Sequence, residues 1–108
     1  MLGRGMFDFR TREEKERDFD AFYKKVFPGG EEQRKRVKKQ VEGEFPGREG
    51  AYVFTFYLSV KELLLDDREL GFWEAAGKAA RRLSAVGLNR AALERLKRVM
   101  EEDMGREL

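Results

Sequence analysis

Residues 51–65 read Ala-Tyr-Val-Phe-Thr-Phe-Tyr-Leu-Ser-Val-Lys-Glu-Leu-Leu-Leu and form the most apolar stretch of the chain. Charged residues make up 41% of the 108 residues, yet the first charge inside this stretch is Lys61. A run of large apolar side chains must be buried, either against its own chain or against a second copy. We therefore expect the rest of the chain to be arranged around this stretch.

The same stretch is compatible with two secondary structures. Aromatic and β-branched side chains alternate over residues 51–60, which is typical of a strand. Four polar residues recur instead at the spacing of one helix face: Thr55, Ser59, Glu62 and Asp66. The sequence contains no second strand candidate, and a lone strand leaves its backbone groups unpaired. We predict a helix over about residues 50–66; a strand at 51–60 in an α+β fold is the alternative.

The sequence before this stretch predicts two helices. The first covers residues 12–27, after a capping box formed by Thr11 and Glu14. Its apolar residues follow a helical stripe that we expect to face inward: Phe19, Phe22, Tyr23, Val26 and Phe27. The second covers residues 31–45 and has a thin apolar seam of Val37, Val41 and Phe45. Pro28, Gly29 and Gly30 separate the two helices.

The sequence after this stretch predicts two more helices. One covers residues 69–85, with Asp66 and Asp67 supplying negative charge at its start. Apolar residues recur along it at helical spacing: Leu70, Trp73, Ala76, Ala80 and Leu83, with Phe72, Ala75 and Ala79 beside them. The other covers residues 90–104, with Asn89 as its N-cap and Gly105 at its C-terminal end. The predicted fold is all-α: a compact bundle of about five helices around the central one.

One domain is expected for a chain of 108 residues, with residues 1–10 as an extended lead-in. The sequence contains neither a signal peptide nor an apolar run long enough to span a membrane, so we expect a soluble, cytoplasmic protein. Cysteine and histidine are both absent. Their absence excludes cysteine nucleophiles, Ser-His pairs and zinc sites with histidine ligands. We expect no enzymatic activity and no cofactor; a carboxylate site for a metal such as Mg²⁺ is the one credible form of an enzyme.

The leading hypothesis for function is a non-enzymatic protein-interaction or assembly role, with a homodimer favoured. The central stretch is apolar around nearly its full circumference, and the thin seam of the second helix offers little to cover it. A second copy would then complete the cover. The candidate self-association residues are Tyr52, Phe54, Phe56, Tyr57 and Trp73.

The competing hypothesis is nucleic-acid binding through two basic stretches, residues 34–39 and 78–98. Cations on one face would contact phosphates and give salt-dependent affinity. The candidate contacts are Arg34, Lys35, Arg36, Lys38, Lys39, Arg81, Arg82, Arg90, Arg95, Lys97 and Arg98. Flanking acidic residues at helical spacing also fit an ordinary solvated surface. The net charge of only +2 indicates no strong overall attraction to anions.

Overall fold

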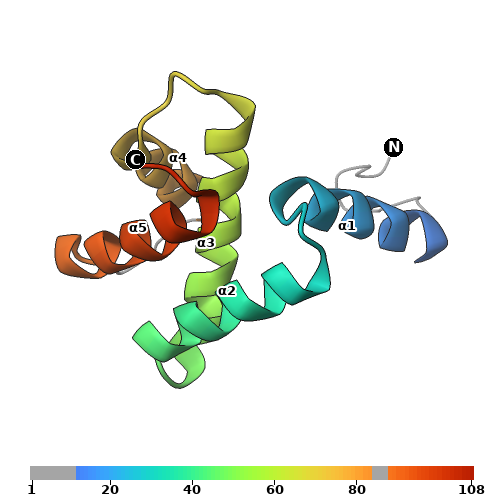
Figure 1. Ribbon diagram of the computed structural model, residues 1–108, viewed down its shortest axis with the longest axis horizontal. Coiled ribbons are helices and arrows are strands. Elements are labelled where there is room, and N and C mark those ends of the chain that lie inside the picture. Colours follow the sequence, from blue (N-terminus) through green and yellow to red (C-terminus); the bar gives the residue numbers. More distant parts are fainter. Residues whose placement is uncertain (1–11, 84–87) are drawn as a thin grey trace, which may run out of the picture.

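A computed structural model describes residues 12–83 and 88–108, and within them the chain forms five helices and no strand. The helices are α1 (Arg12–Val26), α2 (Glu31–Glu44), α3 (Arg48–Asp66), α4 (Phe72–Leu83) and α5 (Arg90–Met104) (Figure 1). The all-α prediction is therefore confirmed, and the strand alternative for residues 51–60 is wrong, because that segment lies inside α3. The predicted lead-in at residues 1–10 lies outside the described residues.

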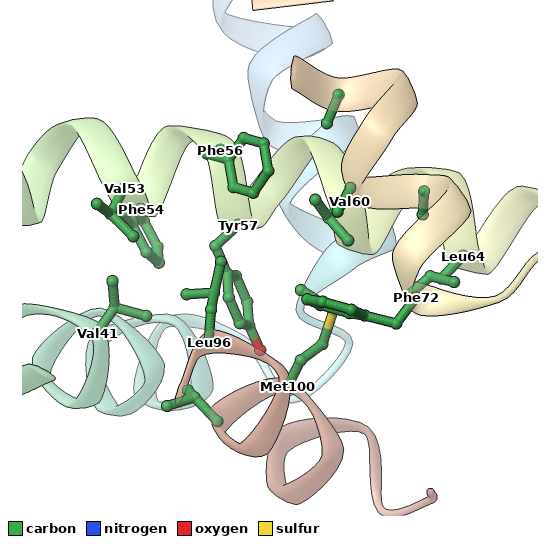
Figure 2. Close-up of a cluster of buried hydrophobic side chains, with 14 of the residues drawn as sticks. Val41, Val53, Phe54, Phe56, Tyr57, Val60, Leu64, Phe72, Leu96 and Met100 are labelled. Carbon is green, nitrogen blue, oxygen red and sulfur yellow. The ribbon is translucent and has the colours of Figure 1, made fainter. Parts of the chain in front are cut away.

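Helix α3 is the centre of the fold, and each of the other four helices packs against it. Figure 1 shows α3 in the middle, with α1 on one side and α4 and α5 on the other. Its apolar residues form much of the core: Val53, Phe54, Phe56, Tyr57, Val60 and Leu64 (Figure 2). On its polar face Thr55 and Asp66 are exposed, as the helical spacing of polar residues predicts.

A single copy of the chain buries most of the apolar side chains of α3, which is more cover than expected, although Tyr52 and Leu65 are exposed. The thin seam of α2 is sufficient, since Val37, Val41 and the following Phe45 are all buried. Helix α4 contacts α3 more extensively than any other helix does. Its buried face includes Ala75, Ala76 and Ala79, whose small side chains allow the two helix backbones to approach closely.

The buried face of α4 differs from the predicted one. The helix begins at Phe72, and the residues that it buries are Phe72, Ala75, Ala76 and Ala79. Leu70 and Ala76 of the predicted stripe are also buried, whereas Trp73 is 39% exposed. Asp67 does not belong to this helix; it is the C-cap of α3, and its carboxylate accepts a hydrogen bond from the backbone N–H of Glu69 at 2.9 Å. Because Phe72 fills the core position, the indole of Trp73 points to the surface.

The predicted limits of α5 are confirmed, together with both of its caps. The side chain of Asn89 accepts a hydrogen bond from the backbone N–H of Ala92 at 2.8 Å. Gly105 ends the helix with a φ of 68°, in the left-handed region that favours glycine.

Helix α1 extends away from the other helices in Figure 1, and residues 12–21 are all exposed. The inward stripe predicted for this helix holds at its end, where Val26 and the following Phe27 are buried. It is wrong for Phe19, which is 62% exposed and is the most exposed large apolar side chain of the described residues. Only the last turns of α1 reach the core, because the helix axis leads away from the bundle.

The central position of α3 can be tested by cavity formation. Phe56→Ala should lower the free energy of unfolding by about 3–5 kcal/mol, because Phe56 is almost fully buried and its removal leaves a cavity. Chemical denaturation followed by circular dichroism measures this change.

The matched control is Thr55→Ala on the exposed face of the same helix. The Thr55 hydroxyl only donates to the carbonyl of Ala51, at 3.2 Å, and alanine is the better helix former. A change below about 0.5 kcal/mol is expected there. Equal effects of the two substitutions would contradict the assignment of the core face.

Candidate functional site

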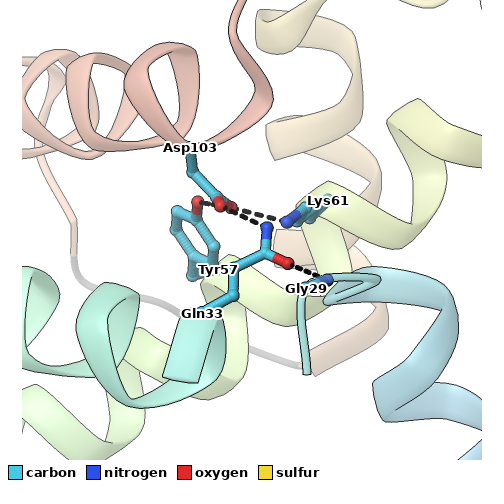
Figure 3. Close-up of polar contacts among 5 residues, drawn as sticks. All are labelled: Gly29, Gln33, Tyr57, Lys61 and Asp103. Carbon is cyan, nitrogen blue, oxygen red and sulfur yellow. Dashed lines mark hydrogen bonds and ion pairs between the residues drawn. The ribbon is translucent and has the colours of Figure 1, made fainter. Parts of the chain in front are cut away.

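The most unusual polar feature of the structure is a buried carboxylate, Asp103, in the last turn of α5. Its side chain is fully buried, and the side chain of its ion-pair partner Lys61 is 3% exposed. The Lys61 ammonium lies 2.5 Å from Asp103 Oδ2, and the Tyr57 hydroxyl donates to the same oxygen at 2.6 Å. Gln33 Nε2 donates to Oδ1 at 2.8 Å (Figure 3). Both carboxylate oxygens therefore have partners, as a buried charge requires.

Each partner of Asp103 comes from a helix that the apolar core has already placed. Tyr57 and Lys61 are four residues apart on α3, so they lie on one face of that helix. Gln33 lies in the first turn of α2, and its Oε1 accepts a hydrogen bond from the backbone N–H of Gly29 at 2.6 Å. The network thus connects α2, α3, α5 and the turn that follows α1.

Burial has the largest effect on the pKa values of Lys61 and Tyr57. Burial lowers the pKa of Lys61, and the charge of Arg36 acts in the same direction; the hydrogen bond and negative charge of Asp103 oppose both. Burial also raises the pKa of Tyr57, and the adjacent Asp103 carboxylate adds to that rise, so the phenol stays protonated and donates. The Lys61 ammonium also lies 4.5 Å from the centroid of the Phe27 ring, a favourable cation–π position.

Sequence reasoning missed this network. Asp103 follows two other acidic residues in the sequence, but its side chain lies on the same face of α5 as Leu96 and Met100. The signal that could have found it was a charge on an otherwise apolar stripe, which occurs at Lys61 on α3 and again at Asp103 on α5. Because a buried charge needs a partner of opposite sign, these two positions would have predicted the pairing of Lys61 with Asp103.

The candidate self-association residues do not form a common surface. Phe54, Phe56 and Tyr57 are buried inside the chain, because α1, α2, α4 and α5 enclose α3. They are not accessible to a second copy of the folded chain, which corrects their selection as surface residues. Tyr52 and Trp73 remain on the surface. The guanidinium of Arg90 lies 4.6 Å from the centroid of the Trp73 ring.

The two basic stretches are brought together in part. Helices α2 and α5 pack against each other, so residues 34–39 lie on a helix next to the one that carries residues 90–98. Several candidate cations have carboxylate partners within the described chain: Arg34, Lys35, Arg82, Arg90 and Arg95. The remaining candidates form no ion pair within residues 12–83 and 88–108: Arg36, Lys38, Lys39, Arg81, Lys97 and Arg98.

Two kinds of site are not found in the part of the chain that the structure describes. No group of three or more acidic side chains there is arranged to hold a metal ion. No helix of those residues has the length and apolar character needed to cross a membrane.

The fold and the buried network define an all-α bundle whose polar centre is closed to solvent. Comparison of the chain with protein-family models, with curated proteins and with solved structures finds no match. The site must therefore be interpreted from its own geometry.

The buried pair can be tested with a double-mutant cycle. Lys61→Met and Asp103→Leu should each destabilise the protein by about 3–5 kcal/mol, because each leaves a buried charge without its partner. The double variant removes both charges, so its cost should fall below the sum of the single costs by about 2–3 kcal/mol. Urea denaturation of the four proteins gives these values.

The matched control is the exposed pair Arg12 and Glu16, 3.4 Å apart at i, i+4 on α1. Its coupling energy should be only about 0.3–0.5 kcal/mol. Similar coupling energies for the two pairs would show that Lys61 and Asp103 are not paired in a buried environment.

Proposed function

We propose that this chain is a small non-enzymatic interaction protein that self-associates, with a homodimer formed through α1 as its active form. The observation that carries the proposal is the exposure of Phe19 on a helix that extends from the bundle. The cytoplasmic location expected from the composition belongs to the same proposal. The dimer surface differs from the one that the sequence suggested, since most of those residues lie in the core.

The argument against an enzyme combines composition and burial. The sequence has no histidine and no cysteine, the two side chains that most often serve as base or nucleophile near neutral pH. Burial lowers the pKa of Lys61, but the side chains of Lys61 and Asp103 are almost inaccessible to solvent. A substrate could reach them only if the helices separated. We therefore assign the pair a structural role and not a catalytic one.

The argument for α1 as the interaction element is its exposed apolar surface. Phe19 is 62% exposed, and its ring stacks on that of Tyr23 one turn later, with 5.9 Å between centroids. Phe22 and Tyr23 are only partly buried. Exposed aromatic side chains grouped on one element are typical of protein-interaction surfaces.

The oligomeric state of the full chain tests the proposal. Size-exclusion chromatography with light scattering at micromolar concentration should give twice the mass of the chain. Phe19→Glu should shift the protein to the monomer, because it places a charge in the apolar contact. The control Thr55→Glu adds the same charge to an exposed position on α3 and should leave the dimer intact. A wild-type protein that is monomeric throughout this range would refute self-association.

Nucleic-acid binding is the second candidate, favoured by the packing of α2 against α5. This packing puts Arg36 and Lys39 on the helix beside that of Arg98, and none of the three has an acidic partner in the described chain. Such cations are free to contact phosphates.

Titration of labelled duplex DNA and RNA at low and at physiological salt tests this candidate. If binding occurs, the triple variant Arg36→Glu, Lys39→Glu, Arg98→Glu should reduce the slope of log affinity against log salt by about 0.9 for each DNA phosphate that is no longer neutralised. Undetectable binding of the wild-type protein at low salt would exclude the candidate.

A further inference from the structure

A groove lies beside Phe19, between the second half of α1 and the start of α2. It has a volume of about 200 Å³. Its apolar lining comes from Tyr23 and Phe27, and the charged side chains around it are Asp20, Lys24, Glu31 and Arg34. The Arg34 guanidinium lies 5.4 Å from the centroid of the Tyr23 ring. An aromatic pocket with a charged rim can bind an aromatic side chain of a partner that has charged residues beside it.

Phe19 and this groove are neighbours on one helix. Phe19 precedes the groove residue Tyr23 by one turn and stacks on it, but it does not line the groove. The most exposed apolar side chain and an open aromatic groove are therefore adjacent on the same face. If a two-fold axis relates two copies and Phe19 of one copy lies in the groove of the other, then Phe19 of the other copy also lies in the groove of the first. Such an arrangement closes on itself as a dimer.

We infer that Phe19 of each copy occupies the groove between α1 and α2 of the other copy. This inference rests on the proposed self-association and specifies its geometry. The groove is large enough, because an apolar cavity of about 150 Å³ accepts a benzene ring. Tyr23 of the partner would then supply the aromatic contact to the Phe19 ring, since Phe27 is only 1% exposed, and aromatic pairs contribute beyond the area that they bury.

The charges on α1 favour the same antiparallel arrangement. When two copies of α1 pair antiparallel about a two-fold axis at the level of Phe22, Phe19 lies level with the partner's Lys25, between its groove residues Lys24 and Phe27. Asp20 then lies opposite the partner's Lys24, and Lys24 lies opposite the partner's Asp20. Both side chains belong to exposed residues. Opposite charges at the rim of an apolar contact fix its register and disfavour other pairings.

A mixing experiment tests this geometry with two charge-reversed variants. Asp20→Lys places like charges opposite each other in its homodimer, and Lys24→Asp does the same with negative charges. Each variant alone should therefore dimerise at least about tenfold more weakly than the wild type. The Asp20→Lys variant has lysine at both positions 20 and 24, and the Lys24→Asp variant has aspartate at both. When the two are mixed, the lysines of one chain face the aspartates of the other, so a heterodimer should form with near wild-type affinity. Analytical ultracentrifugation and native mass spectrometry measure the affinities and identify the heterodimer.

Recovery in the mixture supports the inference. If the substitutions weakened dimerisation only by disturbing their own chain, the addition of the other variant would not restore it. The control Glu102→Lys reverses a charge on an exposed position of α5 and should leave the dimer unchanged. Circular dichroism confirms that each variant is folded. If the wild type dimerises but the variants have no effect, or the mixture fails to recover, the geometry is wrong while self-association stands. A monomeric wild type would overturn both.

Discussion

The structure depends on keeping the charge of Asp103 paired inside an apolar core. A carboxylate without partners at this depth would cost several kcal/mol, so its donors must be held in place. Three of its hydrogen bonds come from Gln33, Tyr57 and Lys61, which lie on α2 and α3. Apolar packing alone tolerates small rotations of one helix against another, whereas this set of contacts does not. We therefore attribute to the ion pair a role in fixing how the helices are aligned against one another.

A chain of this length can bury most of α3 because each of the other helices covers it with few apolar side chains. The alanines of α4 bring two backbones close together, and α2 covers its side of α3 with little more than Val37 and Val41. What remains outside the core is the greater part of α1. The most exposed of the large apolar side chains, Phe19, lies on this projecting helix and belongs to the interaction surface that we propose; Tyr52, Leu65 and Trp73 are exposed on α3 and α4.

The sequence predicted the limits of the helices more accurately than it predicted which side of each helix is buried. Helix limits depend on local signals, such as the Asn89 cap and Gly105, which act through neighbouring residues. Which side of a helix is buried depends on the axis direction and on its partners, so the exposure of Phe19 and Trp73 was not predictable from spacing alone. The pairing of Lys61 with Asp103 joins residues 42 positions apart, and only the tertiary fold brings them together. Tyr57 was recognised as important but assigned to a surface, because an aromatic run does not indicate what covers it.

The absence of a side chain at Gly29 links the interior of the bundle to its projecting helix. A Cβ atom at this position would lie 2.8 Å from Oε1 of Gln33, the same amide whose nitrogen holds Asp103. Any larger residue would displace Gln33, and with it a donor of the buried carboxylate, although Gly29 itself lies on the surface. The turn at Gly29 also joins α2 to α1, whose last turn is held on α3 by the ion pairs of Lys25 with Glu62 and Asp66. A buried carboxylate on the last helix and a surface turn between the first two helices are thus linked through a single glutamine side chain.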